Sequence, residues 1–190
     1  MKDALITTAT EQDITSLNTL VNSAYRGDNS RKGWTTEADL LDGIRVDENA
    51  LRVMLRDPAV TILKYEQEGH LLGCVYLEKK DIEAEPTIAR QKSLYLGMLT
   101  VAPESQANGI GRTLLGAAEQ RAVAWQCRAI VMTVITARHE LIAWYQRRGY
   151  EPTGETKPFP DDSRFGIPKQ PLSFIVLKKE VSLLTSAAVN

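Results

Sequence analysis

Apolar residues along this chain of 190 residues fall into runs of strand length and stretches with helical spacing. Residues 94–101 and 128–135 are two nearly uninterrupted apolar runs. Between them, Leu114 and Ala118 are four residues apart, as on one buried face of a helix. We therefore expect a strand, a helix at 110–125 and a second strand, joined as a parallel, right-handed βαβ unit.

The flanking sequence predicts further elements of ordinary length. Strands are expected at 5–9, 60–65, 71–77, 150–156 and 171–179, helices at 11–24, 35–41, 48–56 and 138–148, and loops at 25–33, 79–92 and 157–170. Thr10 is the expected cap of the first helix, with Asp13 as its capping-box partner. Gly149 is the expected stop of the last helix.

The composition is that of an ordinary globular chain, with 43% hydrophobic residues, 25% charged residues and a formal net charge of −1. Its length favours one domain over residues 1–180 with a C-terminal tail at 181–190. The near-neutral charge argues against nucleic acid and a polybasic membrane patch. The sequence shows neither a membrane-length apolar run nor a secretory h-region, so we expect a cytoplasmic protein.

The cysteines and histidines are few. Cys74 and Cys127 could form one disulfide, but their apolar surroundings favour two buried free thiols. His70 and His139 are the only histidines, and no cluster has the spacing of metal ligands. We therefore expect no metal ion.

A loop with two glycines, Gln106-Ala107-Asn108-Gly109-Ile110-Gly111-Arg112, follows the first apolar run. The glycines allow the backbone to approach a ligand closely with its N–H groups turned outward. The helix start adds unpaired N–H groups and a positive dipole end, and Arg112 adds a full charge. The loop therefore predicts a phosphate or pyrophosphate site, the alternative being a helix start with two turn glycines. It lacks the P-loop lysine and the G-x-G-x-x-G spacing, so ATPase and dinucleotide functions fit poorly.

Two motifs resemble the GNAT N-acetyltransferase superfamily. Val101-Ala102-Pro103 followed by Gln106-x-x-Gly109-x-Gly111 resembles its acetyl-coenzyme A loop. Trp144-Tyr145 followed by Arg147-Arg148-Gly149-Tyr150 resembles its Y-x-x-x-G-F/Y signature, and the element order is compatible over about 5–179. The resemblance implies a GNAT fold of the α/β class, with a mixed, mostly antiparallel sheet of six or seven strands flanked by helices on both faces.

The resemblance also implies acetyl-coenzyme A (acetyl-CoA) as co-substrate and direct transfer of its acetyl group to a primary amine of a small molecule or peptide. It implies a bulge in the strand at 94–101 that turns main-chain amides, those of Leu99 and Val101, toward the thioester. Residues expected to contact acetyl-CoA are Leu99, Thr100, Val101, Gln106, Ala107, Asn108, Gly109, Ile110, Gly111, Arg112 and His139, with Arg138 as an alternative to His139. Neither cysteine has the setting of a nucleophile, which disfavours an acyl-enzyme.

Tyr145 is the candidate general acid. A phenol with a pKa near 10 suits a departing thiolate whose pKa is roughly 8.5 or somewhat above. Tyr145 lies four residues before Gly149, where the family carries its tyrosine. A core tyrosine beside Leu141 and Trp144 is the alternative interpretation.

No general base is evident. Family members often carry a carboxylate on the central strand, but Leu96-Gly97-Met98-Leu99 has none. The amine proton must therefore leave through water or through an acid from elsewhere, such as Glu37, Glu78 or Asp161.

The segment after the first helix lines the acceptor pocket in the GNAT pattern. This makes Tyr25, Arg26, Trp34 and Glu37 candidates for substrate contact, the alternative being a solvated loop with an aromatic anchor. Acidic residues expected near the mouth, Glu37, Asp161 and Asp162, hint at a cationic amine. A non-catalytic acyl-CoA sensor and an unrelated phosphate-binding domain remain alternatives, and the chain could be a monomer or a homodimer.

Overall fold

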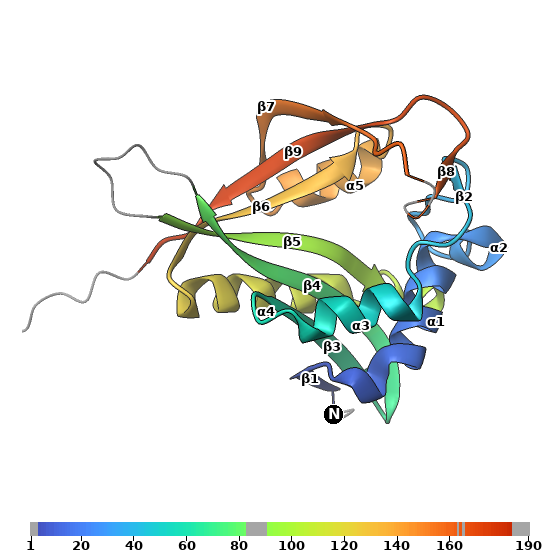
Figure 1. Ribbon diagram of the computed structural model, residues 1–190, viewed down its shortest axis with the longest axis horizontal. Helices are drawn as coiled ribbons and strands as arrows, with labels where there is room; N and C mark the ends of the chain where they lie inside the picture. Colours follow the sequence, from blue (N-terminus) through green and yellow to red (C-terminus); the bar gives the residue numbers. More distant parts are fainter. Residues whose placement is uncertain (1–3, 83–90, 163, 165, 184–190) are drawn as a thin grey trace, which may run out of the picture.

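The computed structural model describes residues 4–82, 91–162, 164 and 166–183. It contains a seven-stranded sheet in the order β1-β3-β4-β5-β6-β9-β7 (Figure 1). In that order the strands are β1 (Ala4–Thr8), β3 (Val60–Gln67), β4 (His70–Ile82), β5 (Gln91–Val101), β6 (Cys127–Ile135), β9 (Ser173–Glu180) and β7 (Glu151–Pro158). The β5–β6 pair is parallel and the other five pairs are antiparallel, which confirms the expected mixed sheet.

Helices cover both faces of this sheet. The helices are α1 (Ile14–Tyr25), the short α2 (Gly27–Ser30), α3 (Glu48–Arg56), α4 (Ile110–Ala124) and α5 (His139–Gln146), with 3₁₀ turns at η1 (Glu11–Asp13) and η2 (Pro103–Ser105). Buried residues of α4 and α5 share one hydrophobic cluster, and those of α1 and α3 share another. The neighbours Ile62 and Leu63 on β3 belong to different clusters, because successive side chains of a strand point to opposite faces.

The predicted βαβ unit is confirmed as β5–α4–β6. Gly73 on β4 explains how closely α4 packs on the sheet: an added Cβ would lie 2.9 Å from Cδ1 of Leu114 and 3.1 Å from Cγ2 of Ile110. The missing side chain lets α4 rest directly on the strand. This contact fixes the start of α4, and with it the loop at 106–112.

The implied bulge in β5 is also confirmed. Cys74 of β4 pairs with Thr100, whereas Tyr76 pairs with Gly97, so β5 has one extra residue between these pairs. In the described ladder, β5 pairs with β6 only as far as Tyr95, and β6 continues alongside β9. The two central strands therefore diverge toward their carboxyl ends (Figure 1).

Several local predictions are confirmed. Thr10 and Asp13 form the expected capping box at η1, directly before α1. Gly149 follows α5 with φ +82°, a left-handed conformation that suits glycine at a helix stop. Cys74 and Cys127 are both buried free thiols.

The helix predicted at 35–41 is wrong. This segment forms turns that end in β2 (Leu41–Asp42), which pairs with β8 (Ile167–Pro168) in a small second sheet. Glu37, expected in the first turn of that helix, is instead buried and bonded to arginines from two other elements. These ion pairs with residues outside the segment outweigh its local helix preference.

Three predicted loops contain regular structure. Residues 25–33 include α2, residues 157–170 include β8 and the end of β7, and β4 and β5 extend into both ends of 79–92. Residues 83–90, the central part of the predicted loop at 79–92, lie outside the described residues, and so does the predicted tail from residue 184 onward. Polar residues on an exposed strand resemble loop residues in sequence, which explains the errors at β4, β5, β7 and β8.

Candidate active site

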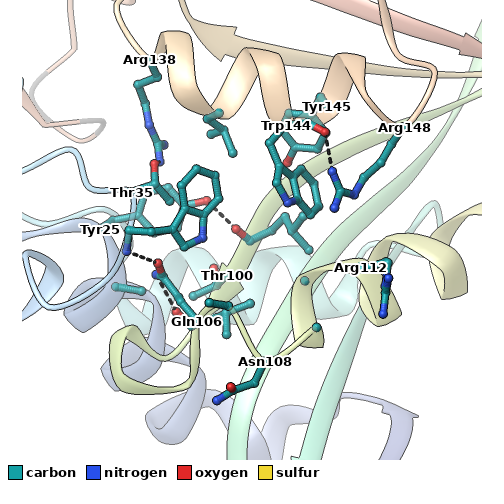
Figure 2. Close-up of a pocket in the computed structure, with 18 residues that line it drawn as sticks. Tyr25, Thr35, Thr100, Gln106, Asn108, Arg112, Arg138, Trp144, Tyr145 and Arg148 are labelled. Carbon is teal, nitrogen blue, oxygen red and sulfur yellow. Dashed lines mark hydrogen bonds between the residues drawn. The ribbon is translucent and has the colours of Figure 1, made fainter.

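A cavity of about 510 Å³ lies where the end of β5, the start of α4 and α5 come together (Figure 2). It is lined by Ala24, Tyr25, Trp34, Thr35, Leu99, Thr100, Val101, Gln106, Ala107, Asn108, Gly109, Gly111, Arg112, Arg138, Leu141, Trp144, Tyr145 and Arg148. Nine of the eleven residues predicted to contact acetyl-CoA are therefore brought together around one space. Figure 2 shows the loop side chains facing those of α5 across it.

The other two residues of that prediction lie elsewhere. The side chain of Ile110 is 3% exposed and belongs to the core, so only its main chain could meet a ligand. His139, the first residue of α5, is exposed and is not among the lining residues of this cavity. Arg138, the residue before it, lines the cavity instead.

The loop before α4 has the backbone that its glycines predict. Gly109 is the N-cap of α4 with φ +85°, and its lack of a side chain leaves the first N–H groups of the helix without a side-chain cap. Gln106 holds the loop in place: its Nε2 donates to the carbonyl of Val101 (3.3 Å), and its Oε1 accepts from the main-chain N–H of Trp34 (3.0 Å). An anion placed here would meet the positive end of a 15-residue helix.

The charges around this cavity are positive. Arg112, Arg138 and Arg148 line it, and none of the described residues that line it is acidic. The Arg148 guanidinium stacks 3.7 Å from the ring centroid of Trp144 and donates from Nη1 to that residue's carbonyl (2.7 Å). Burial, and then the charges of Arg147 and Arg112, lower the pKa of Arg148. Bound phosphates would offset the repulsion between these guanidinium groups.

A second cavity of about 420 Å³ occupies the opening between β5 and β6. It is lined by Tyr25, Arg26, Glu37, Leu41, Arg45, Lys80, Tyr95, Leu96, Gly97, Met98, Leu99, Met132, Thr133, Val134, Ile135, Arg138, Leu141, Tyr145, Lys157, Pro158, Phe159, Pro160 and Phe174. Five residues line both cavities: Tyr25, Leu99, Arg138, Leu141 and Tyr145. The two spaces therefore meet at the bulge of β5 and the inner face of α5.

Tyr145 lies at this junction. Its ring is packed edge-on against Trp144 (5.0 Å between centroids) and Tyr150 (5.8 Å), and the residue is 5% exposed. Burial raises the pKa of Tyr145 above its ordinary value, so the phenol is protonated at neutral pH. No hydrogen bond joins its hydroxyl to another residue within the described ranges, whereas Tyr25 Oη donates to the carbonyl of Leu99 (3.1 Å).

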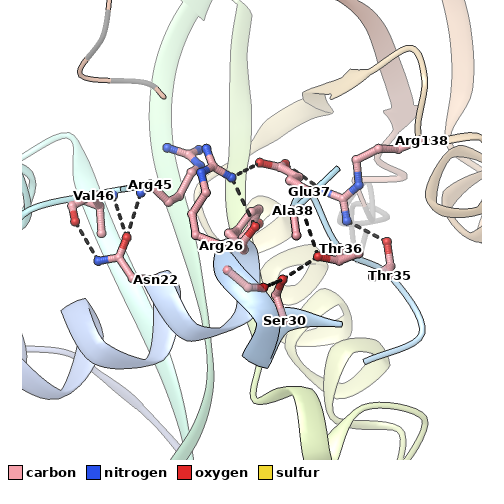
Figure 3. Close-up of polar contacts among 12 residues, drawn as sticks. Asn22, Arg26, Ser30, Thr35, Thr36, Glu37, Ala38, Arg45, Val46 and Arg138 are labelled. Atoms are coloured by element: carbon pink, nitrogen blue, oxygen red, sulfur yellow. Dashed lines mark hydrogen bonds and ion pairs between the residues drawn. The ribbon is translucent and has the colours of Figure 1, made fainter. Parts of the chain in front are cut away.

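The four residues predicted to contact the acceptor occupy different places. Tyr25 lines both cavities, Trp34 lines only the first, and both Arg26 and Glu37 line only the second. Glu37 is 6% exposed and held between two arginines (Figure 3). Its Oε2 accepts from Nη1 of Arg26, and its Oε1 accepts from Nη1 of Arg138 at 2.9 Å.

None of the carboxylates considered as a general base is free in a cavity. Glu37 is held by its two arginines. Glu78 accepts from Tyr76 Oη (3.2 Å) and pairs with Lys80 (3.3 Å), and neither it nor Asp161 lines either cavity. None of these three carboxylates is therefore placed to accept a proton freely in either cavity.

Sequence reasoning missed three of the cations that line the second cavity, Arg45, Lys80 and Lys157. They come from three distant segments, and no local motif marks them. In the part of the chain that the structure describes, no three His, Cys, Asp or Glu side chains are grouped to hold a metal ion. Within those same ranges, every helix is too short or too polar to cross a bilayer.

Comparisons with known proteins agree with this architecture. A family model described as "Acetyltransferase (GNAT) family" matches residues 15–150. Among proteins with a curated function, none matches the sequence significantly. Many solved structures share the fold, and three illustrate the likeness.

Arabidopsis thaliana NAA60, solved in complex with acetyl-CoA, has 13% sequence identity and a TM-score of 0.69 over 94% of this chain and 99% of that one. The ribosomal-protein-alanine N-acetyltransferase from Brucella melitensis has 22% identity and a TM-score of 0.66 over 93% and 99%. An N-acetyltransferase from Staphylococcus aureus has 15% identity and a TM-score of 0.64 over 95% and 99%. The family model covers more than half of the sequence, and the chain belongs to the GNAT acetyltransferase family.

Proposed function

We propose that this protein transfers the acetyl group of acetyl-CoA to a primary amine, by direct attack of the amine on the thioester. The observation that supports this most strongly is the meeting of two cavities at Tyr145. One cavity has a helix N-terminus and three arginines, which suit a pyrophosphate. The other opens between the diverging strands, where an acceptor amine would reach the same point.

Main-chain N–H groups and arginines of the first cavity would bind the coenzyme. The main-chain N–H groups of the loop and of the first turn of α4 would hold the pyrophosphate, with Arg112 and Arg148 beside it. The N–H groups of Leu99 and Val101, at and beyond the bulge, would bind the pantetheine arm and stabilise negative charge on the thioester oxygen.

The attacking amine forms the C–N bond as the C–S bond breaks, and Tyr145 Oη–H donates its proton to the departing sulfur. The amine loses a proton to water, and the phenolate regains one from solvent. The products are an amide and free CoA. Tyr25 also lines both cavities, but its hydroxyl already donates to the carbonyl of Leu99, so Tyr145 is better suited as the acid.

A non-catalytic acyl-CoA sensor is the second candidate. The observation in its favour concerns Glu37, the only carboxylate among the described residues that line the two cavities. Glu37 is held by two arginines and is not available as a base. An amine that enters unprotonated needs no such base, which is why we favour the enzyme.

Two measurements on the purified chain distinguish these functions. Acetyl-CoA, but not ATP, should raise the thermal unfolding midpoint, since ligand binding to the native state stabilises it. Release of free thiol should then depend on added amine across a panel of primary amines. Stabilisation by acetyl-CoA without thiol release from any amine would support the sensor, and stabilisation by ATP alone would exclude both.

A further inference from the structure

We infer that the acceptor is a small amine that also carries an anionic group, a carboxylate or a phosphate. This inference rests on the proposed function and specifies the substrate class of the same site. In the part of the chain that the structure describes, the charged residues that line the second cavity are five cations and one acid: Arg26, Arg45, Lys80, Arg138, Lys157 and Glu37. An acceptor with a second positive charge would enter this space against net repulsion.

The one acid cannot serve a cationic acceptor. Both carboxylate oxygens of Glu37 accept hydrogen bonds from arginines, one from Arg26 and one from Arg138 (Figure 3). An ammonium group approaching Glu37 would therefore meet two guanidinium groups as well. Asp161 and Asp162, which hinted at a cationic amine in the sequence, do not line either cavity, and Asp162 pairs with Arg164. That hint is not supported by the arrangement of charges.

Arg45 is the cation best placed to receive an anion. Its guanidinium lies 5.5 Å from the ring centroid of Tyr25, and that of Arg138 lies 6.0 Å from the same centroid. Within the described ranges, no carboxylate forms an ion pair with Arg45, and its side chain is only partly exposed. A half-buried guanidinium beside an open cavity is suited to bidentate binding of a carboxylate or phosphate.

The two lysines have a lesser role. Lys80 and Lys157 are exposed and pair with Glu78 (3.3 Å) and Glu155 (3.4 Å), neither of which lines the cavity. Solvent and salt screen such pairs strongly. The lysines therefore add positive potential at the rim, while Arg45 would make the contact that distinguishes one acceptor from another.

The size and walls of the cavity favour a small acceptor. Its volume of about 420 Å³ is that of a small-molecule site. Phe159 and Phe174 stack on each other (5.3 Å between centroids) and form an apolar part of the wall. This wall suits a short apolar portion of the acceptor. A compact molecule that carries both an amine and an anionic group is an amino acid or an amino phosphate.

Matched acceptors test the charge preference. Glycine, glycinamide and ethylenediamine provide a carboxylate, a neutral group and a second amine, and phosphoethanolamine with ethanolamine forms the phosphate pair. Thiol release would be compared as kcat/KM, corrected for the unprotonated fraction of each amine. We expect at least one anionic acceptor to exceed its neutral partner by about tenfold or more. The two pairs show whether carboxylate or phosphate is preferred.

Variants of Arg45 identify the residue responsible. Arg45→Gln should raise the KM of the favoured anionic acceptor by about tenfold, with kcat and the KM of the neutral partner changed less than about twofold. Arg45→Glu should move the preference toward ethylenediamine. Arg128→Gln is the matched control, because Arg128 is exposed at the start of β6 and lines neither cavity. Equal effects of Arg45→Gln on all acceptors would overturn the inference, as would a wild-type preference for neutral or cationic amines.

A binding measurement separates this inference from the proposed function. Calorimetry with the chain and CoA would compare N-acetylglycine with N-acetylglycinamide, and N-acetylated phosphoethanolamine with N-acetylethanolamine, none of which requires turnover. Tighter binding of an anionic ligand that is lost in Arg45→Gln supports the anion site even if no amine releases thiol, in which case the proposed function fails. Turnover with equal binding within both pairs leaves the proposed function intact and overturns the anion site.

Discussion

Tyr145 combines the two interpretations that its sequence position allowed. Its ring is packed in the core on Trp144 and Tyr150, and the residue also lines both cavities. Its hydroxyl has no hydrogen-bond partner in the described ranges. A local motif could mark this tyrosine because Gly149, the other residue of the motif, lies only three residues beyond the end of the same helix. It could not mark Arg45, whose place in the site depends on how distant segments pack.

Removing the hydroxyl of Tyr145 should separate its two roles. Tyr145→Phe keeps the ring contacts, so the unfolding midpoint and the affinity for acetyl-CoA should change little. Thiol release should slow by about 10²-fold or more, because the thiolate would leave without a proton donor. Steady-state kinetics and a thermal melt check both expectations, and unchanged turnover would remove Tyr145 from the proposed reaction.

Glu37 should contribute far more to stability than a surface acid does. Glu37→Gln leaves two buried arginines facing a neutral amide, and we expect the free energy of unfolding to fall by about 3 kcal/mol. Glu11→Gln is the control, because Glu11 pairs with Arg56 on the exposed surface (2.9 Å) and should matter little. Urea unfolding measures both, and similar small losses would show that the buried cluster is not stabilising.

At the scale of elements, the contact between α4 and β4 positions the loop at 106–112. The helical spacing of apolar residues and the two glycines made the loop at 106–112 and the helix after it predictable from sequence. The segment at 35–41 was mispredicted because its local residues favour a helix, whereas Glu37 bonds to Arg26 and Arg138, which both lie outside the segment. The same packing brings Arg138 rather than His139 to the cavity, a difference of one residue that no periodicity could resolve.

Substitution of two glycines by alanine should change the stability of the protein in opposite directions. Gly73→Ala would force its new Cβ against Leu114 and Ile110 and push α4 away, lowering stability by about 1–3 kcal/mol and weakening acetyl-CoA binding. Gly116→Ala, within α4, meets nothing within 4 Å and should raise stability by about 0.5–1 kcal/mol. Chemical unfolding and calorimetry measure these effects, and a stabilised Gly73→Ala would contradict the packing described.

At the scale of the whole molecule, buried thiols and phenols should set the stability at high pH. Burial raises the pKa of the Cys74 thiol to about 12, whereas the same thiol in the unfolded chain would have a pKa of about 8.5. Between these values the unfolded state has lost a proton that the native state keeps, so the free energy of unfolding falls as the pH rises. Burial also raises the pKa of Tyr145 and Tyr150, which acts in the same direction.

We therefore expect stability to be unaffected by these groups below about pH 8.5 and to decline progressively above it. Urea unfolding at a series of pH values between 7 and 10.5 measures the decline. Cys74→Ala should show a shallower fall over the same range, even if its stability at pH 7 is lower. A constant or rising stability in the parent chain would contradict the burial of these groups.

The most direct test of the proposed reaction is an experimental structure of the chain with acetyl-CoA bound. We expect the pyrophosphate against the main-chain N–H groups of 106–112, and the thioester sulfur within hydrogen-bonding reach of Tyr145 Oη. A coenzyme seated elsewhere, or a sulfur that lies away from this hydroxyl, would contradict the proposed arrangement and leave only the fold.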